Sequence, residues 1–385
     1  MLSRGTMGVA EFGIANIRVR RNGAFSIHRR PVLGVFTTIG TEAHESVHFG
    51  VDHATGLKAI VAIHSTALGP SLGGTRFYPY PDEQSALVDV LRLSKGMTYK
   101  AAAAGLAQGG GKAVIIGDPQ ELASDELFRS YGRFIDGLAG KYITAEDVGT
   151  TVANMEIVST ETKYVSGLPI ENGGSGDPSP GTARGVYASM RAVSEHLWGT
   201  DDLSGRRVTI KGVGKVGHFL AEILAEKGVE LVVADVNGQA TDAVARELGA
   251  KVVSVDEIHK IECDIFSPCA LGADLNERSI PDLACEAIVG SANNQLAVDD
   301  DATRIADRGI LYAPDFVVNA GGIINIAAEV GGYSVEKSNR MVDRIYDNLT
   351  EILETSTQLG ISTEKAAEHV AESRIDAAPK QGDES

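Results

Sequence analysis

One segment of this 385-residue sequence restricts its fold more than any other. Gly212-Val213-Gly214-Lys215-Val216-Gly217 has the spacing GxGxxG, follows the apolar run Val208-Thr209-Ile210 and opens a helical pattern. Asp235 ends the next apolar run along the chain. A strand, a glycine turn, a helix and a second strand that ends in an acid are typical of a parallel βαβ unit that binds a dinucleotide.

The cofactor follows from the chemistry of such a unit. Glycines allow backbone N–H groups to approach a pyrophosphate at the helix N-terminus, so we expect the whole segment 212–217 to hold it. The Asp235 carboxylate would accept hydrogen bonds from the adenosine ribose and would repel a 2′-phosphate, which favours NAD over NADP. A glycine turn that only packs a helix on a strand is the alternative that the sequence leaves open.

The remaining patterns predict an α/β protein of two domains. Residues 33–180 are expected to form an N-terminal mixed α/β domain. Within it, residues 46–52 and 57–64 read as a hairpin, and a helix follows the capping residue Asp82. A stretch of glycines and prolines at 167–181 marks the boundary. Residues 181–333 are expected to form a doubly wound Rossmann NAD-binding domain, because short apolar runs recur there at regular spacing.

The chain ends lack such patterns. Residues 1–32 carry six arginines against one acid and are expected to be a disordered extension, with a transit peptide as the alternative. Residues 334–358 are expected to form a C-terminal helix that returns to the first domain. The polar segment 359–385 is expected to be a disordered tail.

Composition restricts the partners and the location. The formal net charge of −17 argues against nucleic acid or an anionic membrane as the main partner. No apolar run is long enough for a transmembrane helix. Three cysteines without a CxxC spacing predict reduced thiols in a cytoplasmic protein rather than a disulfide framework.

Two lysines and an aspartate are the candidate reactive groups. Lys112 follows three glycines, and Lys100 ends the segment Lys95-Gly96-Met97-Thr98-Tyr99-Lys100. A lysine in a cleft beside a second cation has a lowered pKa and can act as a base near neutral pH. Asp147 follows an apolar run, where ligand sites of parallel sheets collect. Solvated surface lysines and a helix-capping Asp147 are the alternatives.

One apparent metal motif is set aside. His44-Glu45-Ser46-Val47-His48 matches HExxH, which binds zinc only when both histidines lie on one face of a helix. Val47, Phe49 and Val51 alternate instead as in a strand, so we expect no metal site.

Taken together, these motifs resemble the Glu/Leu/Phe/Val dehydrogenases, and the leucine and valine enzymes most of all, from about Val35 to about Thr355. The motifs that carry the resemblance are Leu72-Gly73-Gly74-Thr75-Arg76, Lys95 to Lys100, Gly109 to Lys112, Thr144 to Thr150, Gly173 to Pro178, the glycine turn, Ser291-Ala292-Asn293-Asn294-Gln295 and Asn319-Ala320-Gly321-Gly322. The resemblance implies a homo-oligomer that converts an L-amino acid, NAD and water into a 2-oxo acid, ammonium and NADH. It also implies that residues 33–180 bind the substrate and build the oligomer.

The resemblance also implies roles for single residues. Lys112 would assist the attack of water on an imino acid, Asp147 would carry protons, and Lys100 with the Gly73 backbone would hold the substrate carboxylate. Asn294 would lie near the substrate amino group. Cofactor contacts beyond the glycine turn and Asp235 would come from Thr182, Asn293 and Asn319.

Substrate choice rests on the side-chain pocket that the family match predicts. Its lining would be Leu72, Met97, Ala145, Ile323 and Ile326, all apolar, which argues against glutamate. Two isoleucines where leucine enzymes often have valine would narrow the pocket, so valine, leucine or isoleucine is expected. Phenylalanine as the substrate, or a catalytically silent NAD- or amino-acid-binding sensor, remains the alternative.

Overall fold

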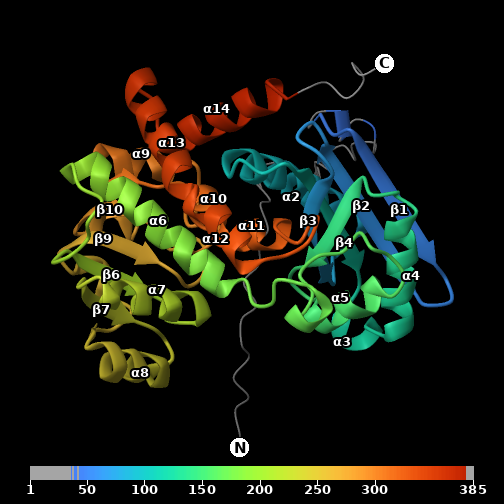
Figure 1. The fold of residues 1–385 in the computed structure, drawn as a ribbon, viewed down its shortest axis with the longest axis horizontal. Helices are drawn as coiled ribbons and strands as arrows, with labels where there is room; N and C mark the ends of the chain where they lie inside the picture. Colours follow the sequence, from blue (N-terminus) through green and yellow to red (C-terminus); the bar gives the residue numbers. More distant parts are fainter. Residues whose placement is uncertain (1–35, 37–38, 41–42, 379–385) are drawn as a thin grey trace, which may run out of the picture.

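The computed structural model describes residues 36, 39–40 and 43–378, which form two α/β domains side by side (Figure 1). The expected fold class is therefore confirmed. The elements of the first domain are β1 (Ser46–Asp52), β2 (Leu57–Ser65), β3 (Ser71–Tyr78), α2 (Glu83–Ala103), β4 (Gly109–Ile116), α3 (Pro119–Leu122), α4 (Asp125–Asp136), β5 (Tyr142–Glu146) and α5 (Val152–Ser159).

The first sheet is mixed, with strand order β1-β2-β4-β3-β5. Strand β2 pairs antiparallel with β1 and β4, whereas β3 pairs parallel with β4 and β5. Side chains alternate across β2: Val61 and Ile63 join the core under α4 and α5, while Ile60 and Ala62 face α2. The expected hairpin is present; the pattern missed β3.

Local signals explain where the helices begin. The Asp82 side chain accepts a hydrogen bond from the backbone N–H of Ser85 and caps α2 as expected. Ser124 caps α4 in the same way, and Thr151 with Asn154 forms a capping box for α5.

The second domain is a parallel six-stranded sheet of order β11-β10-β9-β6-β7-β8, the order of a doubly wound dinucleotide-binding domain. The elements from the linker onward are η1 (Ile170–Asn172), α6 (Ser179–Trp198), β6 (Arg207–Lys211), α7 (Lys215–Glu226), β7 (Glu230–Ala234), α8 (Gly238–Leu248), β8 (Lys251–Val252), η2 (Ile258–Lys260), β9 (Cys263–Pro268), η3 (Ile280–Asp282), β10 (Cys285–Ile288), α9 (Asp300–Asp307), β11 (Leu311–Tyr312), α10 (Asp315–Val318), α11 (Gly321–Ala327), α12 (Val335–Asp343), α13 (Ile345–Leu359) and α14 (Thr363–Asp376).

The C-terminal region departs from expectation. Residues 334–358 form two helices, α12 and α13, instead of one, and most of α13 packs against α6 and α14. The expected disordered tail is wrong for residues 363–376, which form α14. This helix was missed because its buried face consists of small residues (Ala366, Ala367, Val370 and Ala371), which give little hydrophobic periodicity. The expected extension 1–32 and the last residues, 379–385, lie outside the described residues.

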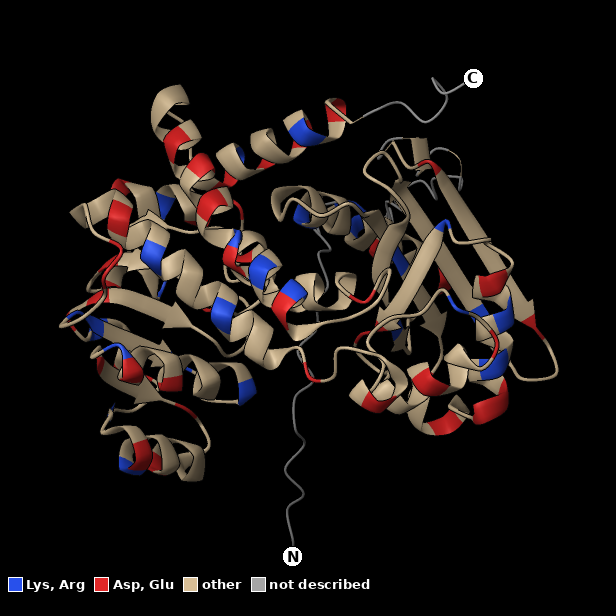
Figure 2. Cartoon of the chain, in the orientation of Figure 1, with Lys and Arg blue, Asp and Glu red and all other residues tan. Residues whose placement is uncertain are grey.

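Charged side chains of both signs are spread over the two domains (Figure 2). Within the described residues, no helix is long and apolar enough to cross a membrane. In the same part of the chain, no group of three or more His, Cys, Asp or Glu side chains is arranged to hold a metal ion. His44 instead bonds the Ser94 hydroxyl (2.9 Å) and the Leu91 carbonyl (3.0 Å).

Candidate active site between the domains

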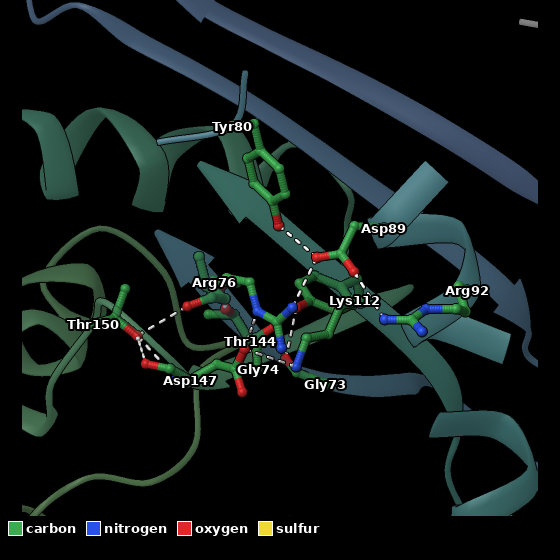
Figure 3. Close-up of polar contacts among 12 residues, drawn as sticks. Gly73, Gly74, Arg76, Tyr80, Asp89, Arg92, Lys112, Thr144, Asp147 and Thr150 are labelled. Carbon is green, nitrogen blue, oxygen red and sulfur yellow. Dashed lines mark hydrogen bonds and ion pairs between the residues drawn. The ribbon is translucent and has the colours of Figure 1, made fainter. Parts of the chain in front are cut away.

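Lys112 and Asp147 form an ion pair inside the first domain (Figure 3). Lys112 lies on β4 on the face toward α2, because its neighbours Ala113 and Ile115 belong to the opposite core. Asp147 directly follows β5. The Lys112 Nζ lies 3.2 Å from Asp147 Oδ2, and Lys112 is only 6% exposed.

The electrostatics suit a base. Burial lowers the pKa of Lys112 below its usual range, and the Arg76 guanidinium lowers it further, whereas Asp147 and Asp89 oppose the shift. A buried amine held beside a carboxylate, with a lowered pKa, can both accept a proton from water and return it.

Three glycines before a lysine could leave space for a substrate beside the backbone, but the packed structure fills that space. A Cβ at Gly110 would lie 2.1 Å from the Thr98 backbone nitrogen, and one at Gly111 would lie 2.7 Å from the Tyr142 ring. A Cβ at Gly73 would lie 1.8 Å from the Gly111 carbonyl oxygen. The space beside these glycines is therefore filled by α2, β3 and β5, which brings Lys100 and Asp147 close to Lys112 instead of leaving room for substrate at the backbone.

Sequence reasoning missed a chain of charges behind this pair. Arg76 Nε donates to Asp147 Oδ2 (3.2 Å), and Arg76 Nη1 donates to Asp89 Oδ2 (2.8 Å). Tyr80 also donates its hydroxyl to Asp89 (2.6 Å). The signal that could have found Arg76 is its position in the quoted segment 72–76, where its side chain had no assigned role.

Lys100 connects the two domains. It lies in the last turn of α2, and its Nζ donates to Asn319 Oδ1 (2.6 Å). Asn319 in turn donates to Asn293 Oδ1 (2.9 Å). Burial lowers the pKa of Lys100 to about 8, and the charge on Lys112 contributes, whereas Asp315 opposes this shift. The structure thus brings Lys100, Asn293 and Asn319 together; Asn294 is exposed, with a left-handed backbone (φ 51°).

An apolar region adjoins these groups. Leu72 on β3 shares one hydrophobic cluster with Ile323 and Ile326 on α11. Ala145 lies on the same face of β5 as Ile143, which pairs with Leu72. Met97 precedes Lys100 by three residues and so lies on the same side of α2. All five expected pocket residues therefore lie near the joint between β3, β5, α2 and α11.

The glycine turn fits a dinucleotide. Gly212 has φ +100°, and a Cβ at Gly217 would lie 2.0 Å from the Gly212 carbonyl oxygen, so α7 packs directly against the turn. Gly214 begins α7 without a side-chain cap, which leaves the N–H groups of the first turn for phosphate oxygens. Asp235 follows β7, and its Oδ2 accepts the Val213 backbone N–H (2.7 Å), so the carboxylate lies beside the turn.

A cleft of about 570 Å³ lies between the end of β5, the start of α5, the linker and Lys215 at the start of α7. Its lining comes from both domains and includes Glu146, Thr150, Asp177, Pro178 and Lys215. Lys215 and Asp177 form an ion pair (3.1 Å) across it. Thr182, one turn into α6, donates its hydroxyl to Pro178 (3.0 Å) and lies against Gly322.

Comparison with known proteins identifies the family. Residues 42–164 match the dimerisation domain of the Glu/Leu/Phe/Val dehydrogenases, and residues 233–382 match the second domain model of the same family. The chain belongs to the Glu/Leu/Phe/Val dehydrogenase family. Residues 181–280 of this dehydrogenase also match the NAD-binding domain of D-isomer specific 2-hydroxyacid dehydrogenases. The family, the amino-acid dehydrogenase class and the NAD cofactor expected from the sequence are confirmed.

Individual relatives cover nearly the whole chain. A leucine dehydrogenase of Bacillus cereus is 49% identical over 89% of this chain and 94% of its own length. A valine dehydrogenase of Streptomyces albus is 49% identical over 86% of this chain and 92% of its own. The crystal structure of an L-tryptophan dehydrogenase from Nostoc punctiforme is 44% identical with a TM-score of 0.83, covering 89% of this chain and 99% of that one.

Proposed function

We propose that this dehydrogenase oxidatively deaminates a branched-chain L-amino acid (valine, leucine or isoleucine) to its 2-oxo acid and ammonium, and catalyses the reverse reductive amination. The observation that carries the proposal is the buried Lys112–Asp147 pair beside the apolar cluster of Leu72, Ile323 and Ile326. Similarity to leucine and valine dehydrogenases supports the same substrate class.

The residues divide the reaction between them. Lys100, charged, holds the substrate carboxylate together with the Gly73 backbone, and Asn294 lies near the amino group. NAD, when bound along the segment 212–217 with Asp235, Thr182, Asn293 and Asn319 nearby, supplies the acceptor for the hydride removed from the substrate Cα. Lys112, neutral, takes a proton from the water that attacks the imino acid, and Asp147 carries protons to and from the leaving ammonia.

An aromatic L-amino acid is the second candidate substrate. It is favoured by the 44% identity to an L-tryptophan dehydrogenase. The half-buried side chains of Ile323 and Ile326 limit the size of the proposed pocket, and pocket size should discriminate between the two substrate classes. One methylene in such a pocket discriminates substrates by about 1–3 kcal/mol.

We also propose a homo-oligomer in the cytoplasm. The match of residues 42–164 to a dimerisation domain supports self-association. Cys263 and Cys285 pair in register on β9 and β10, yet both are free thiols, as is Cys269. Three cysteines without a CxxC spacing favour a reducing compartment.

The decisive test is a spectrophotometric NADH assay across a panel of L-amino acids, with NAD and NADP compared. We expect turnover with branched-chain substrates and a preference for NAD. Turnover with aromatic substrates alone would favour the second candidate, and no NADH with any amino acid would contradict the proposal.

Lys112→Ala should lower kcat by about 10²- to 10⁴-fold, the usual contribution of a general base. Binding of NAD, measured by protein fluorescence, should persist, since Lys112 lies apart from the glycine turn. Lys58→Ala is the matched control, because Lys58 is an exposed lysine of the same sheet. Normal turnover of Lys112→Ala would refute the assignment of the base.

A further inference from the structure

Asp147 and Asp89 are joined through a single guanidinium. Arg76, on β3, places Nε on Asp147 and Nη1 on Asp89, which belongs to α2 (Figure 3). The side chains of Arg76 and Asp147 are each 24% exposed, and that of Asp89 is 17% exposed. Such a partly desolvated, hydrogen-bonded chain orients its members more strongly than a surface ion pair does.

Two cations contact the same oxygen of the Asp147 carboxylate. Its Oδ2 accepts from Arg76 Nε and from Lys112 Nζ, each at 3.2 Å. Its main chain is also fixed, because the Asp147 backbone N–H donates to the Thr150 hydroxyl (2.9 Å), which donates to the Thr75 carbonyl (2.9 Å). One carboxylate oxygen is thereby committed to the two cations, and the direction of the other follows from it.

Arg76 is itself held from behind. Asp89 Oδ2 accepts from Arg76 (2.8 Å) and from the Tyr80 hydroxyl (2.6 Å). Arg92, which is 77% exposed, adds only a longer contact to Asp89 Oδ1 (3.4 Å). Asp89 therefore anchors the guanidinium in the plane in which it meets Asp147.

We propose that Arg76, anchored by Asp89, is a positioning residue that holds the Asp147 carboxylate against Lys112 for the amino-acid dehydrogenase reaction. The inference rests on the proposed roles of Lys112 and Asp147. It assigns to two residues outside the substrate and cofactor contacts the task of fixing the geometry and the charge balance of the reacting pair.

The charges around Lys112 predict the direction in which each substitution should shift the pKa of its amine. The charged groups that face Lys112 are Asp147 after β5, Arg76 on β3, and Asp89 and Lys100 on α2. Arg76 lowers the pKa of Lys112, whereas Asp89 raises it. Removing the guanidinium should move the loss of the Lys112 proton to higher pH, and removing the Asp89 charge should move it to lower pH.

The first test needs neither substrate nor cofactor. Competitive acetylation with acetic anhydride over a pH series, read by mass spectrometry of the Lys112 peptide, reports where this amine loses its proton. We expect the midpoint to rise in Arg76→Met and to fall in Asp89→Asn. Unchanged midpoints, or shifts of both variants in the same direction, would overturn the proposal.

The second test uses the reaction. Arg76→Met should lower kcat by about 10- to 100-fold, the cost of misplacing a reacting group by about an ångström, while KM for the amino acid changes less. Arg76→Lys keeps the charge, so it should restore the wild-type midpoint and part of kcat. A KM-only effect, or no rescue by lysine at either readout, would contradict positioning through charge.

Controls separate this inference from the proposed function. Arg92→Gln removes an exposed cation from the same Asp89 and should leave midpoint and kcat unchanged. If Arg76→Met does not fold, Asp89→Asn must still lower the midpoint while Arg76→Lys leaves it at the wild-type value, and any other result contradicts the proposal. If the wild-type protein oxidises no amino acid, the proposed function fails, yet the acetylation midpoints still decide whether Arg76 and Asp89 govern Lys112.

Discussion

Lys100 combines two roles that conflict at high pH. As the proposed anchor of the substrate carboxylate it must be charged, yet burial and the neighbouring Lys112 lower its pKa to about 8. Asn319 accepts from its Nζ across the domain boundary, so the same ammonium also contributes to the contact between domains. Loss of the Lys100 proton will therefore affect substrate binding and the contact between domains together.

This predicts a pH-dependent KM. Below about pH 8 Lys100 keeps its proton and binds the carboxylate; above it, the neutral amine loses that attraction, so KM for the amino acid should rise with pH. Initial-rate measurements over a pH series would show the rise. In Lys100→Arg the cation persists at every accessible pH, so its KM should respond only to the titration of the substrate itself. Parallel KM curves for both proteins would exclude Lys100 as the group responsible.

At the level of elements, α14 caps the C-terminal end of α2. Arg374 Nη1 donates to the Ala102 and Ala103 carbonyls, each at 2.9 Å, in the last turn of α2. A cation at a helix C-terminus satisfies carbonyls that lack helical partners. Tyr99 also donates to Glu372 of α14 (2.9 Å). Lys100 lies between these contacts, so α14 fixes the helical turn that carries it.

Arg374→Ala should therefore reduce stability and weaken substrate binding together. Loss of hydrogen bonds from a charged group costs about 1.5–3 kcal/mol, which denaturant unfolding would measure, and KM for the amino acid should rise as the end of α2 loosens. Glu351→Gln is the control, since it removes only an exposed partner of Arg374. A stability loss with an unchanged KM would show that α14 supports the fold without positioning Lys100.

For the whole molecule, the joint between the domains depends on backbone contacts of the linker. Glu329, which follows α11, accepts hydrogen bonds from the Ser175 N–H (2.8 Å) and the Gly167 N–H (3.0 Å). The glycine-rich segment between the domains is thus tied to the helix that carries Ile323 and Ile326. Movement of one domain against the other would change the pocket and the cofactor cleft together.

The proposed homo-oligomer also belongs to this scale. Strand β1 is an edge of its sheet, and Phe49 and Val51 on it are 54% and 62% exposed, which marks a surface that another chain can cover. We expect sedimentation velocity to show an oligomer, and Phe49→Lys with Val51→Lys to shift it toward smaller species. Val252→Lys on β8, an edge strand of the sheet in the second domain, is the matched control and should change nothing. A wild-type monomer would contradict the expectation.

The sequence alone predicted those features that depend on neighbouring residues. The glycine turn with Asp235, the capping of α2 by Asp82 and the hairpin of β1 and β2 each depend on residues close together in sequence, where periodicity and backbone preference act directly. The candidate reactive residues Lys100, Lys112 and Asp147 stood out for the same reason, because each lies in a short segment of distinctive composition.

Tertiary structure alone decided how these segments meet. The Arg76–Asp147 contact joins residues 71 positions apart, and Lys100–Asn319 joins residues 219 apart. Such contacts depend on strand order and on close packing over glycines, which no local pattern encodes. Helix α14 could not be predicted for a similar reason. Its small residues are buried only because α2 and α13 pack against them, and the sequence of the helix alone does not show that packing.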